Sequence, residues 1–339
     1  MRIILSRRHV LTGLAAAGAA GMVRGERADA AALETASVRI PRLGSGTICA
    51  APIGVADELL RAEGFNEIVY VPLSTAAGSG DATEVVGAGT ADFFLNFAST
   101  LTAAIDRGVR IRALAGIHAG CFGLFAHEGI QKIADLKGRQ VALSAMGSPA
   151  HLFLAAMAAY VGIDPRRDIN WVIAPPGVRT INLFIEHKSD AFFAFPPQPQ
   201  ELRERRIGHI IVDSAIDRPW SQYFCCLLYG NSDYVRNYPN ATRAVVRAIL
   251  KATDLCAERP EQVTRQLVEN GLSVAYDRSL EVIRELPFRE WREHDPEDTM
   301  RFYALRLHEA GLIKSTPQKI IADGTDWRFL NELKRELKA

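Results

Sequence analysis

Short apolar segments alternate with amphipathic helical segments from Ser37 to about residue 230, and this alternation restricts the fold more than any other feature of the sequence. The predicted strands are 37–41, 67–72, 92–95, 111–116, 123–127, 140–143, 170–173, 191–195, 208–213 and 226–229. The predicted helices between them are 53–63, 82–87, 99–107, 149–161, 179–186 and 198–205. Strands that alternate with helices over this length predict an α/β architecture with mostly parallel sheets.

Two segments, 85–97 and 183–195, resemble each other in layout. Each contains the end of a helix, a short turn that reaches an aspartate (Asp92 or Asp190), and a strand with paired phenylalanines. This weak internal repeat predicts two similarly built α/β lobes. Ligands of open α/β sheets bind beyond the carboxyl ends of the strands. We therefore expect the loops after the two strands, 96–100 and 196–199, to face each other across one cleft.

The sequence after Ser232 is almost entirely helical. The predicted helices are 238–259, 260–270, 277–284, 295–310, 317–321 and 326–338. Proline and glycine punctuate them often, so they should be short packed helices and not a coiled coil. The whole chain of 339 residues is long enough for roughly two domains of about 150 residues each.

The balance of charge excludes some classes of partner. Lys and Arg number 40 against 39 Asp and Glu, which gives a formal net charge of +1. Such a balance offers no electrostatic reason to bind nucleic acid or an anionic membrane surface. A charged ligand would have to be recognised by local groups.

The N-terminal residues have the pattern of an export signal. Arg7 and Arg8 precede a short, weakly apolar stretch rich in Ala and Gly, and small residues follow around Ala30. This pattern predicts a twin-arginine signal peptide over residues 1–30, cleaved near Ala30, and a mature protein in a bacterial periplasm. The alternative is a membrane anchor, but the apolar run is much shorter than the about 20 residues that span a bilayer.

The segment 133–151 predicts a small-molecule site. A buried strand at 140–143 leads through a loop of small residues into a helix, with Ser148 as its N-cap and Pro149 as its first residue. Such a helix start presents unpaired backbone N–H groups and the positive end of the helix dipole. These groups suit an anion or a carboxylate.

The motifs of common catalytic and metal sites are missing from the sequence. It has no Gly-x-Gly-x-x-Gly after a strand, no Walker loop and no Gly-x-Ser-x-Gly elbow. The five cysteines lack Cys-x-x-Cys spacing, and Cys121 and Cys256 lie in apolar runs, where we expect small buried hydrophobic side chains. The eight histidines are scattered. We therefore expect no catalytic residue, no cofactor and no metal.

The order of several short motifs resembles one family. These motifs are Gly64-Phe65 with Val71-Pro72, Gly89-Thr-Ala-Asp92, Asp135-Leu-Lys-Gly138, Gly147-Ser148 with Gly162-Ile-Asp-Pro165, and 238–244 with Glu258-Arg-Pro-Glu261. Together they resemble periplasmic substrate-binding proteins of nitrate/sulfonate/taurine ABC importers, whose domain type is shared with the fungal thiamine-pyrimidine synthases. The resemblance covers nearly the whole mature chain.

This resemblance implies a two-lobe periplasmic-binding-protein fold of type II, with two strands crossing between the lobes. Lobe I would comprise 33–123 plus 229–339, and lobe II would comprise 124–228. The crossings would be 121–126 and 224–229. The resemblance also implies that the protein is a monomeric receptor. It would capture a small anionic or aromatic solute, of the sulfonate, nitrate, carboxylate or pyrimidine class, and deliver it to a membrane permease.

The expected ligand-binding residues lie in loops at strand ends. On the lobe I side they are Thr47, Ser74, Thr75, Asn96 and Ser99; on the lobe II side they are Ser144, Gly147, Ser148 and His151. Arg179 is the expected counter-ion for an anionic ligand, because its planar guanidinium matches the oxygens of a carboxylate or sulfonate. Phe97, Phe195, Trp220 and Tyr223 could supply an apolar or aromatic wall, with Trp220 the better candidate and the core favoured for the two phenylalanines. The alternative for each polar residue is an ordinary turn, cap or core role.

Two other functions stay open. An enzyme of the pyrimidine-synthase type would carry a cysteine-rich run and hold its cofactor through a lysine; here only Cys225 of 221–229 corresponds to that run. A ligand-sensing partner of a membrane receptor would use the same cleft.

Overall fold

The computed structural model describes residues 32–42, 44, 47–73, 82–273 and 275–337. The predicted export signal, together with Ser74 and Thr75, lies outside the described residues. All elements below belong to the unit Leu33–Ala339. None of the helices in the described ranges combines the length and apolarity needed to cross a membrane.

The strands form three sheets. One is the parallel pair β1 (Ser37–Pro41) and β2 (Glu67–Val71). A second has the order β3 (Phe93–Phe97), β10 (Phe224–Asn231), β4 (Ile111–Ala119). The third has the order β7 (Asn170–Ile173), β6 (Gln140–Leu143), β8 (Ala191–Ala194), β5 (Gly123–Ala126), β9 (His209–Asp213).

The strand directions follow from two crossings of the chain between the last two sheets. The connections are 120–122, from β4 to β5, and 214–223, from β9 to β10. β5 is antiparallel to β8 and β9, and β10 is antiparallel to β3 and β4, whereas β6 is parallel to β7 and β8. The two crossings lead into β5 and β10. β5 begins beside the carboxyl end of β8, because Gly123 pairs with Ala194, and β10 begins beside the carboxyl end of β3, because Cys226 pairs with Phe97. The strand ends of both sheets therefore gather at the crossings.

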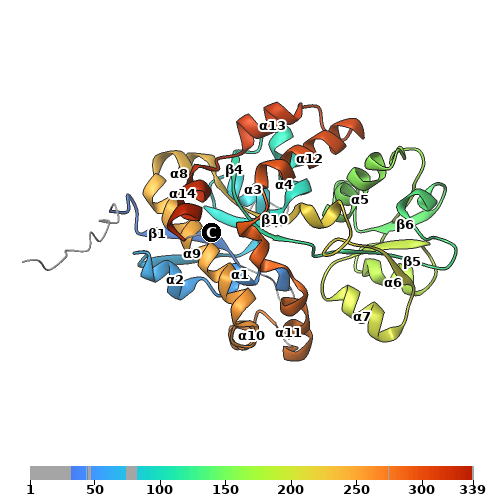
Figure 1. Cartoon of the computed structure of the whole chain (residues 1–339), viewed down its shortest axis with the longest axis horizontal. Coiled ribbons are helices and arrows are strands. Elements are labelled where there is room, and N and C mark those ends of the chain that lie inside the picture. The colour runs from blue at the N-terminus through green and yellow to red at the C-terminus, as the bar shows by residue number, and fades with distance from the viewer. Residues whose placement is uncertain (1–31, 43, 45–46, 74–81, 274, 338–339) are drawn as a thin grey trace, which may run out of the picture. The chain divides into compact units, whose positions relative to one another are not determined.

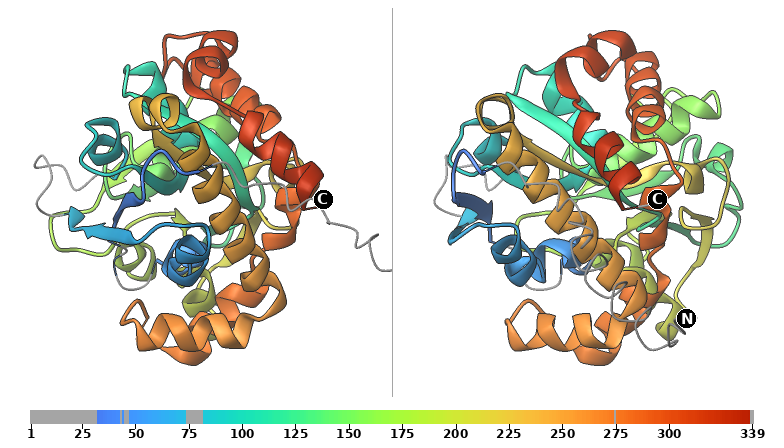
Figure 2. Two further views of the ribbon diagram at one scale, coloured as in Figure 1. Left: turned by 90° about the vertical axis from the view of Figure 1, so that its left-hand side faces the viewer. Right: turned by 60° about the vertical axis from the view of Figure 1, so that its left-hand side comes forward.

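Helices surround the sheets, in two groups that Figure 1 shows clearly. Around β5 and β6 lie α5 (Pro149–Tyr160), α6 (Thr180–Ile185) and α7 (Gln198–Arg205). The other helices are α1 (Ala51–Gly54), α2 (Asp57–Ala62), α3 (Ala82–Gly87), α4 (Ala98–Asp106), α8 (Ser232–Asn237), α9 (Pro239–Glu258), α10 (Pro260–Glu269), α11 (Tyr276–Glu285), α12 (Pro296–Glu309), α13 (Pro317–Gly324) and α14 (Arg328–Glu336). Figure 2 shows the long α9 running beside the blue helices α1 and α2, which it contacts.

The predicted helices differ from the observed ones in two places. The predicted helix 53–63 is two helices, α1 and α2, separated at Val55 and Ala56. The unpredicted α8 precedes α9, because the Asn231 side chain caps it by accepting from the backbone amides of Asp233 and Tyr234, 3.0 and 3.1 Å away. Pro239 then starts α9.

The internal repeat is a real structural correspondence. Asp92 Oδ2 accepts from the Arg39 backbone N–H at 2.7 Å, and Asp190 Oδ2 accepts from the Gln140 backbone N–H at 2.7 Å. Each aspartate also donates its own N–H to the carbonyl of the same partner, at 2.8 Å in both cases. Asp92 therefore holds the start of β3 against β1, and Asp190 holds the start of β8 against β6.

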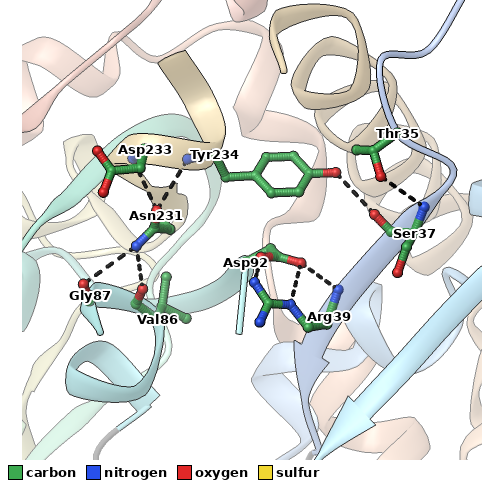
Figure 3. Close-up of polar contacts among 9 residues, drawn as sticks. All are labelled: Thr35, Ser37, Arg39, Val86, Gly87, Asp92, Asn231, Asp233 and Tyr234. Atoms are coloured by element: carbon green, nitrogen blue, oxygen red, sulfur yellow. Dashed lines mark hydrogen bonds and ion pairs between the residues drawn. The ribbon is translucent and has the colours of Figure 1, made fainter. Parts of the chain in front are cut away.

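Figure 3 shows the first of these aspartates and its surroundings. The buried Asp92 carboxylate also takes the Arg39 guanidinium, with Nη2 2.6 Å from Oδ1. Nearby, Asn231 Nδ2 donates to the Val86 carbonyl at 2.8 Å, and Tyr234 donates to the Ser37 carbonyl at 3.2 Å. These bonds tie β1, β3, β10 and α3 together.

Candidate functional site

The ends of the repeated strands β3 and β8 lie close together. Phe97, at the end of β3, lies with its ring centroid 4.8 Å from that of Phe195, which follows β8. Phe153 of α5 touches Phe97 edge-on at 5.6 Å, and Phe122 of the first crossing lies 6.3 Å from Phe195. Both Phe97 and Phe195 are half-buried. An aromatic surface therefore joins the strand ends of the two sheets.

The predicted residues on the β3 side have mixed environments. The Asn96 amide is used internally, because Nδ2 donates to Thr83 Oγ1 at 2.6 Å and Oδ1 accepts from the Phe97 N–H at 2.8 Å. Ser99, in the first turn of α4, is fully buried, and its hydroxyl has no partner among the described residues. Thr47 is exposed at the start of a short 3-10 helix and makes no side-chain cap.

The start of α5 has the predicted capping but a different role for its histidine. Ser148 is the N-cap and accepts from the His151 backbone N–H at 3.4 Å, with Pro149 at the first helical position. His151 is only 3% exposed, and its Nδ1 accepts from the Gly147 N–H at 3.0 Å. Burial lowers the pKa of His151, which favours the neutral ring that this bond requires. Ser144 and Gly147 are exposed at the strand end.

The remaining predicted residues lie in two further groups. Arg179 precedes α6 and pairs with Glu201 of α7 at 3.2 Å. Tyr223 stacks on Phe302 of α12, with ring centroids 4.1 Å apart. Trp220 is buried between Phe302 and Tyr160 of α5, at 6.0 and 5.2 Å. The two aromatic residues thus fill a contact between α5 and α12.

A cavity of about 290 Å³ opens where the first crossing meets α7, β9 and α11, and we call it the crossing cavity. It is lined by Gly120–Gly123, Pro196, Pro199, Gln200, Arg203, Ile210, Asp213, Ala215, Ile216, Val282, Glu285 and Leu286. None of these residues was among the predicted binding residues. Asp213 could have been found by the same rule as the others, since it ends a strand; Glu285 could not, because it comes from a helix far along the chain.

Gly120 shows how tightly the two crossings pass at this cavity. Its φ is +40°, and a Cβ there would overlap the backbone of Ala215. Only glycine fits such an approach without moving one crossing segment.

Four of the five cysteines gather at the same place. Cys121 of the first crossing forms a disulfide with Cys225 of β10, which corrects the prediction of a free buried thiol at Cys121. The residues lie 104 positions apart, so local sequence patterns could not reveal the pair. The Cys226 thiol donates to Cys49 and thereby lowers the Cys49 pKa.

His118 belongs to the same cluster. A ring nitrogen of His118 and the sulfurs of Cys121 and Cys226 all lie within 4.8 Å of one another, and all three residues are buried. Soft metals take such ligands. The Cys121 sulfur is already bonded to Cys225, however, so this arrangement is that of an oxidised pair with two neighbouring thiols.

Residues 67–263, well over half of the chain, match the family model described as NMT1/THI5 like. The chain belongs to this NMT1/THI5-like family. A curated relative, the nitrate import ATP-binding protein NrtC of Synechocystis sp., is 28% identical over 144 residues, which are 40% of this chain. The chain spans 21% of the length of that relative.

Solved structures show which fold this NMT1/THI5-like chain has. The periplasmic nitrate-binding protein NrtA from Synechocystis PCC 6803 is 14% identical, with a TM-score of 0.71 over 90% of each chain. The periplasmic sulfonate-binding protein SsuA from Methylobacillus flagellatus KT is 18% identical, with a TM-score of 0.66 over 89% of this chain and 94% of that one. The desulfurization enzyme DSZB has a TM-score of 0.56 at 16% identity, over 88% of this chain and 99% of that one. These likenesses establish the periplasmic-binding-protein fold.

Proposed function

We propose that this protein is an exported receptor of a nitrate/sulfonate-type ABC importer, working in the periplasm without catalysing a reaction. It would capture a small anionic or aromatic solute between the strand ends of its two sheets and deliver it to a membrane permease. The contact of Phe97 with Phe195 carries the proposal, because it brings together the ends of β3 and β8, where ligands of α/β sheets bind. The fold likeness to NrtA and SsuA supports it.

The geometry at the strand ends favours binding over catalysis. Ser148 Oγ and His151 Nδ1 both accept from backbone amides, so they are not arranged as a nucleophile with its base. The proposed lobes are 33–123 plus 229–339 and 124–228, and they would close on the solute by hinge motion at the crossings. The proposed ligand contacts remain Thr47, Ser74, Thr75, Ser99, Ser144 and Ser148, with the two phenylalanines as the apolar wall.

Isothermal titration of the mature protein with nitrate, alkanesulfonates, aromatic carboxylates and pyrimidines tests this function. We expect saturable binding of one class and no turnover of the bound compound. Replacement of Phe97 or Phe195 by Ala should weaken binding about tenfold or more, whereas the exposed Glu186→Gln variant should bind normally. Absence of binding across the panel together with turnover of one compound would overturn the proposal.

An enzyme of the pyrimidine-synthase type is the second candidate, favoured by the family description and by the DSZB likeness. Cys225, its one corresponding cysteine, is held in a disulfide. A pyridoxal absorbance band in the purified protein would favour the enzyme. A sensor of a membrane receptor would bind the same solutes and would co-purify with that receptor in place of a permease.

A further inference from the structure

We propose that the crossing cavity is a second binding site, and that its ligand is a small organic cation: an ammonium or amidinium group on a compact apolar body. Its volume, about 290 Å³, lies just below the usual range of ligand sites, about 300–1,000 Å³, and suits a small ligand. The proposed ligand is a cation, whereas the solute proposed above is anionic or aromatic. The two sites adjoin, because Phe122 lines this cavity and also lies beside Phe195.

The walls of the cavity are apolar and come from separate parts of the chain. Phe122 belongs to the first crossing, Ile210 to β9, and Val282 to α11. Pro196 and Pro199 close the side next to α7. A ligand with a small hydrocarbon or aromatic body would bury its apolar surface against these side chains.

Gln200 supplies the first unpaired acceptor. The residue is only 3% exposed and lines the cavity. Its Nε2 donates to Glu285 Oε2 at 2.8 Å, and this bond fixes the orientation of the amide. Oε1 is buried and has no partner within the described part of the chain. An unmade hydrogen bond of this kind costs about 1–3 kcal/mol, and a ligand N–H would recover it.

Asp213 supplies the second acceptor. Its Oδ1 accepts from the Ala215 N–H at 2.9 Å, and burial raises its pKa. Across the described residues, no Lys or Arg nitrogen lies within salt-bridge distance of this carboxylate. The cation that lines the cavity, Arg203, is instead held by Glu285 at 2.5 Å and Glu281 at 3.6 Å.

The charged and polar side chains that line the cavity indicate the charge of the ligand. The lining carboxylates of Asp213 and Glu285 outnumber the one lining cation, Arg203, so the cavity favours a positive charge over a negative one. A protonated amine brings a positive charge and three N–H donors, and an amidinium brings paired donors. Either could satisfy Gln200 Oε1 and Asp213 Oδ2 together.

Calorimetry on the full mature chain tests the site with benzylammonium, n-butylammonium and benzamidinium chlorides as probes. Benzyl alcohol and benzoate have the same ring without the positive charge. We expect the cations to bind in this cavity and benzyl alcohol not to bind. Benzoate belongs to the aromatic carboxylates proposed for the main cleft, so any benzoate binding should be unchanged by the cavity variants below. Asp213→Asn and Gln200→Leu should each lower cation affinity about tenfold, and Glu186→Gln, at the exposed residue just after α6, should not change it.

A shift of the Gln200 side-chain amide resonance on addition of benzylammonium would place the cation in this cavity. No cation binding, equal binding of benzyl alcohol, or unchanged cation affinity in both variants would each overturn the proposal. Solute binding in the main cleft is measured in the same samples, so failure here is distinguishable from failure of the proposed function.

Discussion

His118 is a fully buried imidazole whose two ring nitrogens both face carbonyl oxygens. Nδ1 lies 2.9 Å from the Ala119 oxygen and Nε2 lies 3.1 Å from the Cys49 oxygen. Burial lowers the pKa of His118 from 6.5 to about 4, although both carbonyls favour the charged ring. The neutral ring has one N–H, so one nitrogen faces its carbonyl without a proton between them.

We predict that this histidine makes stability pH-dependent in a defined window. The unfolded chain binds more protons than the folded one between pH 6.5 and 4, so the free energy of unfolding falls as the pH is lowered through that range. The total loss is about 3 kcal/mol. Urea titrations at several pH values should show this slope in the wild type and a flatter one in His118→Gln. Equal slopes would contradict the assignment.

The cysteines give a second prediction at the residue scale. Alkylation of the protein in denaturant without reductant should label Cys49, Cys226 and Cys256 but not Cys121 and Cys225. Reduction should expose all five. Because the bridge closes a loop of 104 positions, its removal by Cys121→Ser with Cys225→Ser should cost about 5 kcal/mol. Labelling of all five cysteines before reduction would contradict the pairing.

At the scale of elements, the repeated aspartates should matter more than other turn residues. Asp92→Ala and Asp190→Ala each remove an acceptor from a backbone N–H, so each should lower the free energy of unfolding by about 1–3 kcal/mol. The loss should be larger at Asp92, which also pairs with Arg39. Asn at either position keeps one oxygen and serves as the matched control in urea unfolding. Equal losses for Ala and Asn would show that these bonds are not responsible.

At the scale of the whole described unit, polar contacts join α7 to α11 across the crossing cavity. Arg203 pairs with Glu285 and Glu281, and Arg278 pairs with Glu204. Each partly exposed pair contributes about 0–1 kcal/mol. We predict that Arg203→Gln with Arg278→Gln raises the radius of gyration of the ligand-free protein in X-ray scattering. Arg301→Gln removes a pair within α12 alone and should have no effect. An unchanged radius in the double variant would show that these pairs do not hold the halves together.

The sequence by itself determined the strands, most helices, the cap of α5 and the two similar halves. These depend on the spacing of apolar residues and on capping groups a few positions apart, such as Ser148 and His151. It could not separate an available binding group from one already bonded. Asn96 and His151 are polar residues at strand ends, but neighbouring groups use their polar atoms.

Only the tertiary structure decided the disulfide and the crossing cavity. Cys121 and Cys225 are 104 positions apart, and Gln200 and Glu285 are 85 apart. No local pattern encodes such contacts, because they form only when both crossings and the C-terminal helices have packed.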